Sequence, residues 1–100
     1  MTKQELIFSV AKRSGVDSAV VEKVLNSTLN EAKEAVVSGK TIFIRGFGTL
    51  GPKTRKEKIG QNIRLGQSVV IPAQKLPYFR PSKTFKHEVN QGRVLKANEF

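Results

Sequence analysis

The stretch TIFIRGFGTL, residues 41–50, decides the fold because the sequence pattern changes there. Residues 41–44 form a β-rich run, Arg45-Gly46-Phe47-Gly48 is typical of a turn, and Thr49-Leu50 begin a second strand. The residues before this stretch follow a helical period, whereas those after it do not. We therefore predict an α+β chain in which helices precede an antiparallel sheet.

Residues 1–39 predict a helical hairpin with one apolar stripe. Thr2-Lys3-Gln4-Glu5 fits a capping box at the start of a first helix, and Gly15 ends that helix. Asp17 is placed to cap a second helix, and Gly39 is placed to end it. The stripe of the second helix repeats at the helical period and consists of Val20, Val21, Val24, Leu25, Thr28, Leu29, Ala32 and Val36.

Residues 52–75 predict a β-ribbon arm of two strands that projects from the body of the fold. Residues 52–67 are nearly all polar or glycine, so a disordered linker is the alternative. Strand character returns at Ser68-Val69-Val70-Ile71, and Gly60 and Gly66 bracket a hairpin tip. Such a ribbon has no core of its own, so we expect it to order on a partner.

The rest of the chain completes a small sheet and adds a helix. Residues 76–80 predict a third strand, which makes residues 40–81 a three-stranded antiparallel sheet that carries the arm. A short C-terminal helix is expected over residues 82–90, followed by a tail over residues 91–100. We assign residues 1–100 to a single domain, which suits the length of the chain.

The charge of the chain is strongly uneven. The formal net charge is +10, and residues 1–50 account for +2 of it while residues 51–100 account for +8. A surface this one-sided favours a polyanionic partner, most often nucleic acid. A basic surface that only aids solubility is the alternative.

Composition argues against several other classes of protein. The chain has no cysteine, which excludes disulfides and thiolate metal sites, and no apolar run approaches the roughly 18 residues that span a membrane. Residues 1–5 lack the apolar core of a secretory signal, so we expect a cytoplasmic protein. His87 is the only histidine and Asp17 the only aspartate, and no phosphate-binding loop or metal-ligand spacing is present. We predict no enzyme activity and no cofactor.

The order of these motifs resembles that of the bacterial HU and integration host factor family of histone-like proteins. In that family a Gly-Phe-Gly turn follows two helices, as Gly46-Phe47-Gly48 does here. The family's arm contains Arg-x-x-x-x-Gly-x-Asn-Pro, which residues 55–63 match except that Ile63 replaces the proline. The segment Phe79-Arg80-Pro81-Ser82-Lys83 looks more like integration host factor than HU.

The resemblance implies an obligate intertwined dimer, either a homodimer or a heterodimer. Helices would form its base, a sheet its saddle, and two arms would wrap double-stranded DNA. It implies minor-groove binding with little sequence specificity, DNA bending and organisation of the bacterial nucleoid. The family is itself a standard example of an apolar residue at the arm tip that wedges between base pairs, and Ile63 stands at that position. Three arm positions that are usually basic in HU are Gln61, Gln67 and Val70 here.

Basic residues and residues of the arm tip are the predicted DNA contacts, because cationic side chains neutralise phosphates. The arm supplies Lys53, Arg55, Lys56, Lys58, Gln61, Asn62, Ile63 and Arg64, and the body supplies Lys3, Gly46, Lys75, Arg80, Lys83 and Lys86. Strand alternation predicts that Lys53, Arg55 and Glu57 share one face of the arm while Lys56 and Lys58 share the other. A solvated, charged hairpin that resists edge aggregation is the alternative.

Four apolar residues, Phe47, Leu50, Phe79 and Phe85, are assigned to the dimer core rather than to base stacking. Three other functions stay open at this point. They are a sequence-specific architectural factor in recombination or transcription, a dimeric scaffold for acidic proteins, and an RNA-binding protein.

Overall fold

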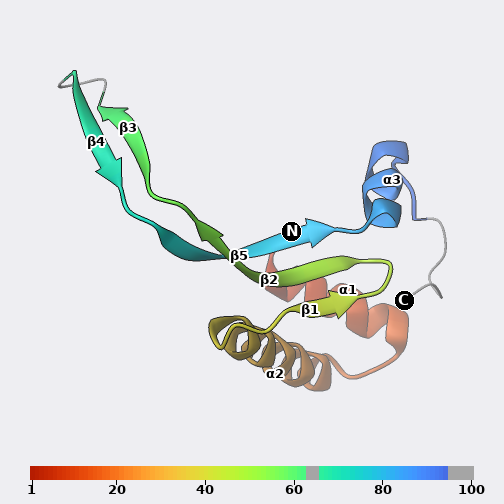
Figure 1. Cartoon of the computed structure of the whole chain (residues 1–100). Coiled ribbons are helices and arrows are strands. Elements are labelled where there is room, and N and C mark those ends of the chain that lie inside the picture. Colours follow the sequence, from red (N-terminus) through yellow and green to blue (C-terminus); the bar gives the residue numbers. More distant parts are fainter. Residues whose placement is uncertain (63–65, 95–100) are drawn as a thin grey trace. The chain divides into compact units, whose positions relative to one another are not determined.

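The computed structural model describes residues 1–62 and 66–94 (Figure 1). In chain order its elements are α1 (Lys3–Ser14), α2 (Ser18–Val37), β1 (Ile42–Ile44), β2 (Gly48–Arg55), β3 (Lys58–Asn62), β4 (Gln67–Ile71), β5 (Gln74–Pro81) and α3 (Lys83–Gln91). This order confirms the predicted α+β class. The contacts divide the chain into two compact units, Met1–Glu34 and Ala35–Phe100. The assignment of residues 1–100 to a single domain stays a prediction.

The predicted helix caps are confirmed. The side-chain oxygen of Thr2 accepts a hydrogen bond from the Glu5 N–H at 3.1 Å. Gly15 ends α1 in the left-handed region with φ 72°, which glycine adopts without steric cost. Asp17 Oδ1 accepts a 3.3 Å hydrogen bond from a first-turn N–H of α2, and Gly39 follows the last turn with φ 91°. These local signals therefore fix where both helices begin and end.

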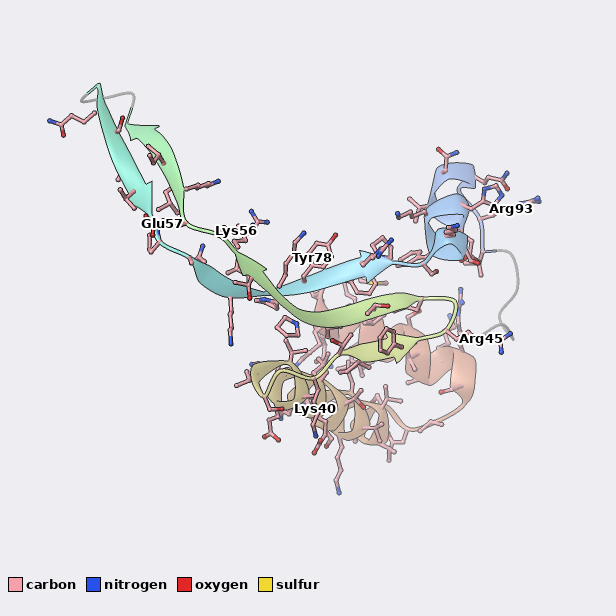
Figure 2. The ribbon with its side chains drawn as sticks, in the orientation of Figure 1. Lys40, Arg45, Lys56, Glu57, Tyr78 and Arg93 are labelled. Carbon is pink, nitrogen blue, oxygen red and sulfur yellow. The ribbon has the colours of Figure 1, made fainter. Side chains whose placement is uncertain are left out.

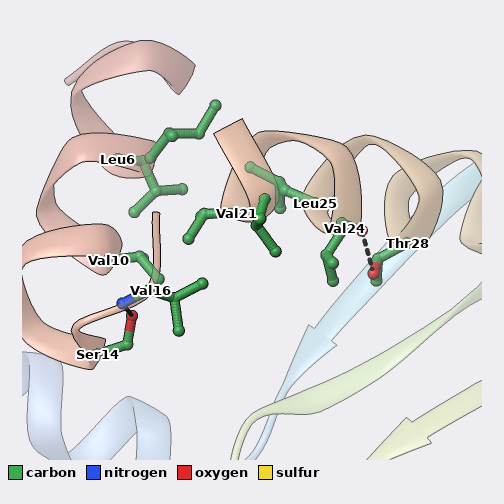
Figure 3. A pocket seen from close by; sticks show the side chains of 10 residues that line it. Leu6, Val10, Ser14, Val16, Val21, Val24, Leu25 and Thr28 are labelled. Atoms are coloured by element: carbon green, nitrogen blue, oxygen red, sulfur yellow. Dashed lines mark hydrogen bonds between the residues drawn. The ribbon is translucent and has the colours of Figure 1, made fainter. Parts of the chain in front are cut away.

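The helical unit leaves most of its apolar stripe uncovered. Among the described residues, Ile7 is the only hydrophobic side chain that is buried. Val24 is 58% exposed although it lies in the middle of the stripe of α2. A groove of about 470 Å³ lies between α1 and α2, lined by Leu6, Val10 and Val21 among others (Figure 3). The two helices do not form a closed core by themselves.

The central sheet is antiparallel with the strand order β1-β2-β5. Leu50 pairs with Ile42 on one side and with Phe79 on the other, so these three residues share a face. Gly48 lies beneath the Phe79 ring, where a Cβ atom would approach ring carbons within 2.6 Å. The glycine is therefore required for the aromatic ring to lie flat on this apolar face.

An aromatic cluster joins the sheet to α3 within the second unit. The Phe47 ring centroid lies 5.1 Å from that of Phe79 and 5.1 Å from that of Phe85. Ser82 caps α3 because its Oγ accepts a 3.0 Å hydrogen bond from the Phe85 N–H. Helix α3 extends one residue beyond the predicted limit and ends at Gly92, which has φ 76°.

The arm is made of two strand pairs, not of one uninterrupted ribbon. Strands β2 and β5 stay paired as far as Arg55 and Gln74, and β3 and β4 then form a separate two-stranded sheet (Figure 1). The break falls at residues 56–57 on one side and at residues 72–73 on the other. Pro72, which has no N–H to donate to a ladder, lies in this break.

This break corrects the prediction about the faces of the arm. Lys53 and Arg55 do share one face, because both lie within β2. Lys56 and Glu57 lie in the break, so strand alternation does not assign them to the faces that the sequence predicted.

The tip residues 63–65 and the tail residues 95–100 lie outside the described residues. Among the described helices, none is long and apolar enough to cross a membrane.

Candidate nucleic-acid interface

The central sheet has a basic face, defined by Lys53, Arg55 and Arg80. One side of β2 carries Thr49, Lys53 and Arg55, because side chains two positions apart on a strand share a face. Thr49 pairs directly with Arg80 on β5, so Arg80 lies on the same side of the sheet. The apolar residues Leu50 and Phe79 lie on the other side. Strand register thus places these three cations on the face opposite Leu50 and Phe79, and all three basic side chains are exposed to solvent.

Tyr78 lies among these cations, on the same face of the sheet (Figure 2). The Nζ atom of Lys53 lies 4.3 Å from the centroid of the Tyr78 ring. Such a contact restrains a long cationic side chain without removing its charge. The basic face therefore holds at least one cation in place before any partner arrives.

Lys75 does not belong to the basic face. It pairs with Thr54, so it lies on the side of the sheet that carries Leu50 and Phe79. The sequence analysis grouped Lys75 with Arg80 among the DNA contacts that the body supplies. The structure places their side chains on opposite faces, although Lys75 is also exposed.

The middle of the arm adds more positive charge. Lys56 and Glu57 lie between β2 and β3 (Figure 2), and Lys58 is the first residue of β3. All three are exposed, as is Arg55 just before them. Three cations thus surround one carboxylate within four consecutive positions, which gives this part of the arm a positive potential.

The predicted tip residues are only partly described. Gln61 and Asn62 end β3, where they pair with Ser68 and Gln67. Gly66 turns the chain back into β4 with φ 64°. The predicted contacts Ile63 and Arg64 lie outside the described residues.

The remaining predicted contacts are spread over the helix starts and one turn. Lys3 is the first residue of α1, and its Nζ donates a 3.0 Å hydrogen bond to Asn26 Oδ1. Lys83 and Lys86 are exposed in the first turn of α3, where helical N–H groups and the helix dipole favour anions. Gly46 has φ 77° in the turn between β1 and β2, next to the exposed Arg45 (Figure 2).

Sequence reasoning missed two aromatic residues that share the basic face. Tyr78 is one of them, and Phe43 is the other, because Phe43 pairs with Thr49. Phe43 is 78% exposed. For Tyr78 the sequence did contain the information, because Tyr78 and Arg80 are two positions apart on one strand and therefore share a face. For Phe43 only the strand register shows that it lies on the basic face.

The aromatic cluster of the other face stays open to solvent. Phe47 and Phe79 contact each other, yet they are 39% and 37% exposed. A contiguous exposed apolar cluster, unlike a single exposed residue, usually marks a surface that a partner covers.

Residues 1–90 match the family model described as bacterial DNA-binding protein. The chain belongs to this family.

Two curated relatives show which members of the family the chain resembles. It is 37% identical to the integration host factor subunit beta of Alkalilimnicola ehrlichii, over 93% of this chain and 94% of the relative. It is also 36% identical to the DNA-binding protein HU-beta of Neisseria meningitidis, over 86% of this chain and 97% of the relative.

Solved structures give the same result. The chain matches HU in the Anabaena HU–DNA cocrystal structure with a TM-score of 0.81 and 34% identity, covering 89% of this chain and 97% of that chain. It matches a V42I mutant of HU from Thermotoga maritima with a TM-score of 0.67 and 31% identity, covering 89% and 99%. The chain is therefore a histone-like architectural protein of the HU and integration host factor group, which is a group of DNA-binding proteins and not of enzymes.

Proposed function

We propose that this chain forms a dimer that binds double-stranded DNA in the minor groove, bends it with little sequence specificity, and so compacts and organises the nucleoid in the bacterial cytoplasm. The basic face carries this proposal. Lys53, Arg55 and Arg80 are aligned on one side of the sheet, and the cations of the arm extend the same positive surface. A duplex that crosses the sheet and enters the arms meets positive charge along this whole path.

Dimerisation is supported by the surface that one chain leaves open. The groove between α1 and α2 and the aromatic cluster at Phe47 and Phe79 are both apolar and exposed. Full burial of each such side chain contributes about 1.5–3 kcal/mol. A second copy that covers both surfaces therefore provides the core that a single chain lacks, and Leu50 and Phe85 belong to the same core.

The arm fits a groove rather than a flat surface. It is a slender two-stranded element that can follow a groove with a phosphate wall on either side, and proteins that enter the minor groove widen and bend the duplex as they do so. In this proposal Arg55, Lys56 and Lys58 contact those phosphates, and Ile63 is the wedge that kinks the duplex. The minor groove has a degenerate pattern of donors and acceptors, so binding follows DNA shape and deformability more than sequence.

A second candidate function is sequence-specific architecture of the integration host factor type. It is favoured by the 37% identity to an integration host factor beta subunit and by the segment Arg80-Pro81-Ser82. This candidate also implies a different partner chain in a heterodimer. Nuclease footprinting on random genomic DNA separates the two functions, since one protected site favours the second candidate and diffuse protection favours the first.

Gel retardation on intact, nicked and pre-bent duplexes at two salt concentrations tests the main proposal. We expect binding to all three, tighter on the nicked and pre-bent duplexes, and weaker at higher salt. Equal affinity for all three duplexes contradicts bending. Preference for matched duplex RNA in competition contradicts a DNA-directed function.

A further inference from the structure

The arm carries an apolar pair that its own fold leaves uncovered. Ile59 on β3 lies directly opposite Val70 on β4. Their side chains are 75% and 60% exposed, so most of their apolar surface faces solvent. Residues directly opposite each other on antiparallel strands share one face of the ribbon, so the two side chains form one apolar patch that spans both strands.

The other face of the same ribbon is packed differently. There Val69 pairs with Gly60, and the Ile71 side chain leans into the space above the glycine. A Cβ atom at Gly60 would lie 3.0 Å from Ile71 Cδ1, so this space is already filled. On that face Val69 is 45% exposed and Ile71 is half-buried, so Ile59 and Val70 are the more exposed apolar pair of the ribbon.

The surrounding charge limits what can cover this pair. Arg55, Lys56 and Lys58 are exposed within four positions of Ile59. A second copy of the arm would bring the same cations together, which is unfavourable. A polyanion that also presents apolar surface fits better, and duplex DNA combines phosphates with the C–H edges of deoxyribose.

We propose that Ile59 and Val70 pack against the deoxyribose walls of the minor groove and supply a salt-independent share of the arm's affinity. This inference rests on the proposed function and deepens it. Phosphate contacts release counterions, so they set how steeply affinity falls with salt. An apolar contact releases none, so it shifts affinity equally at every salt concentration.

The test replaces the apolar pair without weakening the ribbon. The double variant Ile59→Thr, Val70→Thr keeps two β-branched residues and a cross-strand pair, which favour the strand conformation. Val69→Thr is the matched control, because it makes the same change one residue away on the opposite face. Lys58→Ala is the electrostatic control, and we expect it to reduce the salt slope by about one for each protomer, or about two for a homodimer.

Duplex affinity is measured over a range of salt for wild type and all three variants. We expect the double variant to bind about tenfold more weakly at every salt concentration, with an unchanged slope. We expect the affinity of Val69→Thr to stay close to that of wild type.

Three results overturn the inference: an unchanged affinity of the double variant, an equal loss of affinity in Val69→Thr, or a changed salt slope in the double variant. Association of DNA-free wild type beyond the dimer, if the double variant abolishes it, also overturns the inference, since the pair then docks on another copy of the arm. Wild type that fails to bind duplex at any salt contradicts the proposed function instead.

Discussion

The Nζ atom of Lys53 lies 4.3 Å from the ring centroid of Tyr78, so a cation of β2 rests on an aromatic ring of β5. The contact joins the two strands that lead into the arm, on the face that also carries Arg55 and Arg80. An exposed cation–π contact contributes roughly 0.5–1 kcal/mol. Its role here is to hold a cation on the path of the duplex, and this role is testable.

Replacing Tyr78 with Leu removes the ring but keeps an apolar side chain. We expect duplex affinity to fall by a few-fold, because Lys53 loses its restraint and must be ordered when DNA binds. The salt slope stays constant, since no charge is removed. Fluorescence anisotropy measures both quantities. Tyr78→Phe keeps the ring and serves as the control, and a loss in this variant equal to that in Tyr78→Leu refutes the role of the ring.

Phe79 and Phe43 form a matched pair for testing the dimer. They are aromatic residues of the same sheet that lie on opposite faces, 37% and 78% exposed in a single chain. We expect Phe79→Ala to destabilise the dimer by about 3 kcal/mol, because the ring is buried on association. Phe43→Ala is expected to change stability by less than about 0.5 kcal/mol.

Thermal unfolding at several protein concentrations measures this difference. The melting temperature of wild type is expected to rise with concentration, as for any protein that unfolds and dissociates together. A concentration-independent melt combined with a monomeric sedimentation mass would rule out the obligate dimer.

Ile63 is expected to govern bending more than binding. In Ile63→Ala we expect less energy transfer between dyes at the two ends of a duplex, because the duplex is bent less. We expect only a modest change in affinity. The wedge costs free energy when it unstacks a base step, and the bend recovers that cost through further contacts, so the variant loses both contributions. The affinity loss is expected to be smaller on nicked DNA, where kinking is already easy. Ile63→Pro restores the family residue and is expected to keep the bend, since proline fixes φ.

Leu65 is the other apolar residue in the tip sequence, so Leu65→Ala is the control for this prediction. Loss of bending in Leu65→Ala but not in Ile63→Ala means that the wedge assignment is wrong by two residues. An unchanged bend in both variants means that the protein coats DNA without intercalation.

Local signals in the sequence predicted much of the fold. The caps at Thr2, Gly15 and Asp17 depend on neighbouring residues only, so they were readable without tertiary information. The break in the arm was not predicted, because a proline alone does not mark where pairing stops: Pro52 and Pro77 lie inside an intact strand pair, whereas Pro72 lies in the break. Strand alternation correctly predicted which residues share a face within β2, but it gave wrong assignments for the residues in the break.

The candidate site was only partly predictable for a similar reason. Charge and motif spacing indicated a basic, DNA-directed arm, but they do not report register. The place of Phe43 on the basic face and the pairing of Ile59 with Val70 follow from pairing between separate strands. Alternation within one strand does not report that register. The opposite faces of Lys75 and Arg80, by contrast, follow from alternation along β5 alone, so the sequence did contain that information.

The central claim is that the basic face lies against DNA, and the salt dependence of duplex affinity tests it most directly. The triple variant Lys53→Ala, Arg55→Ala, Arg80→Ala is compared with Lys12→Ala, Lys23→Ala, Lys33→Ala, which removes the same charge from exposed positions on α1 and α2. We predict that the first triple variant reduces the slope of log affinity against log salt by about 2.7 for each protomer, at ~0.9 for each lost phosphate contact, which is about 5.4 for a homodimer, while the second leaves the slope near that of wild type. An equal reduction in both variants would mean that DNA responds to net charge alone, which contradicts a defined DNA-binding face.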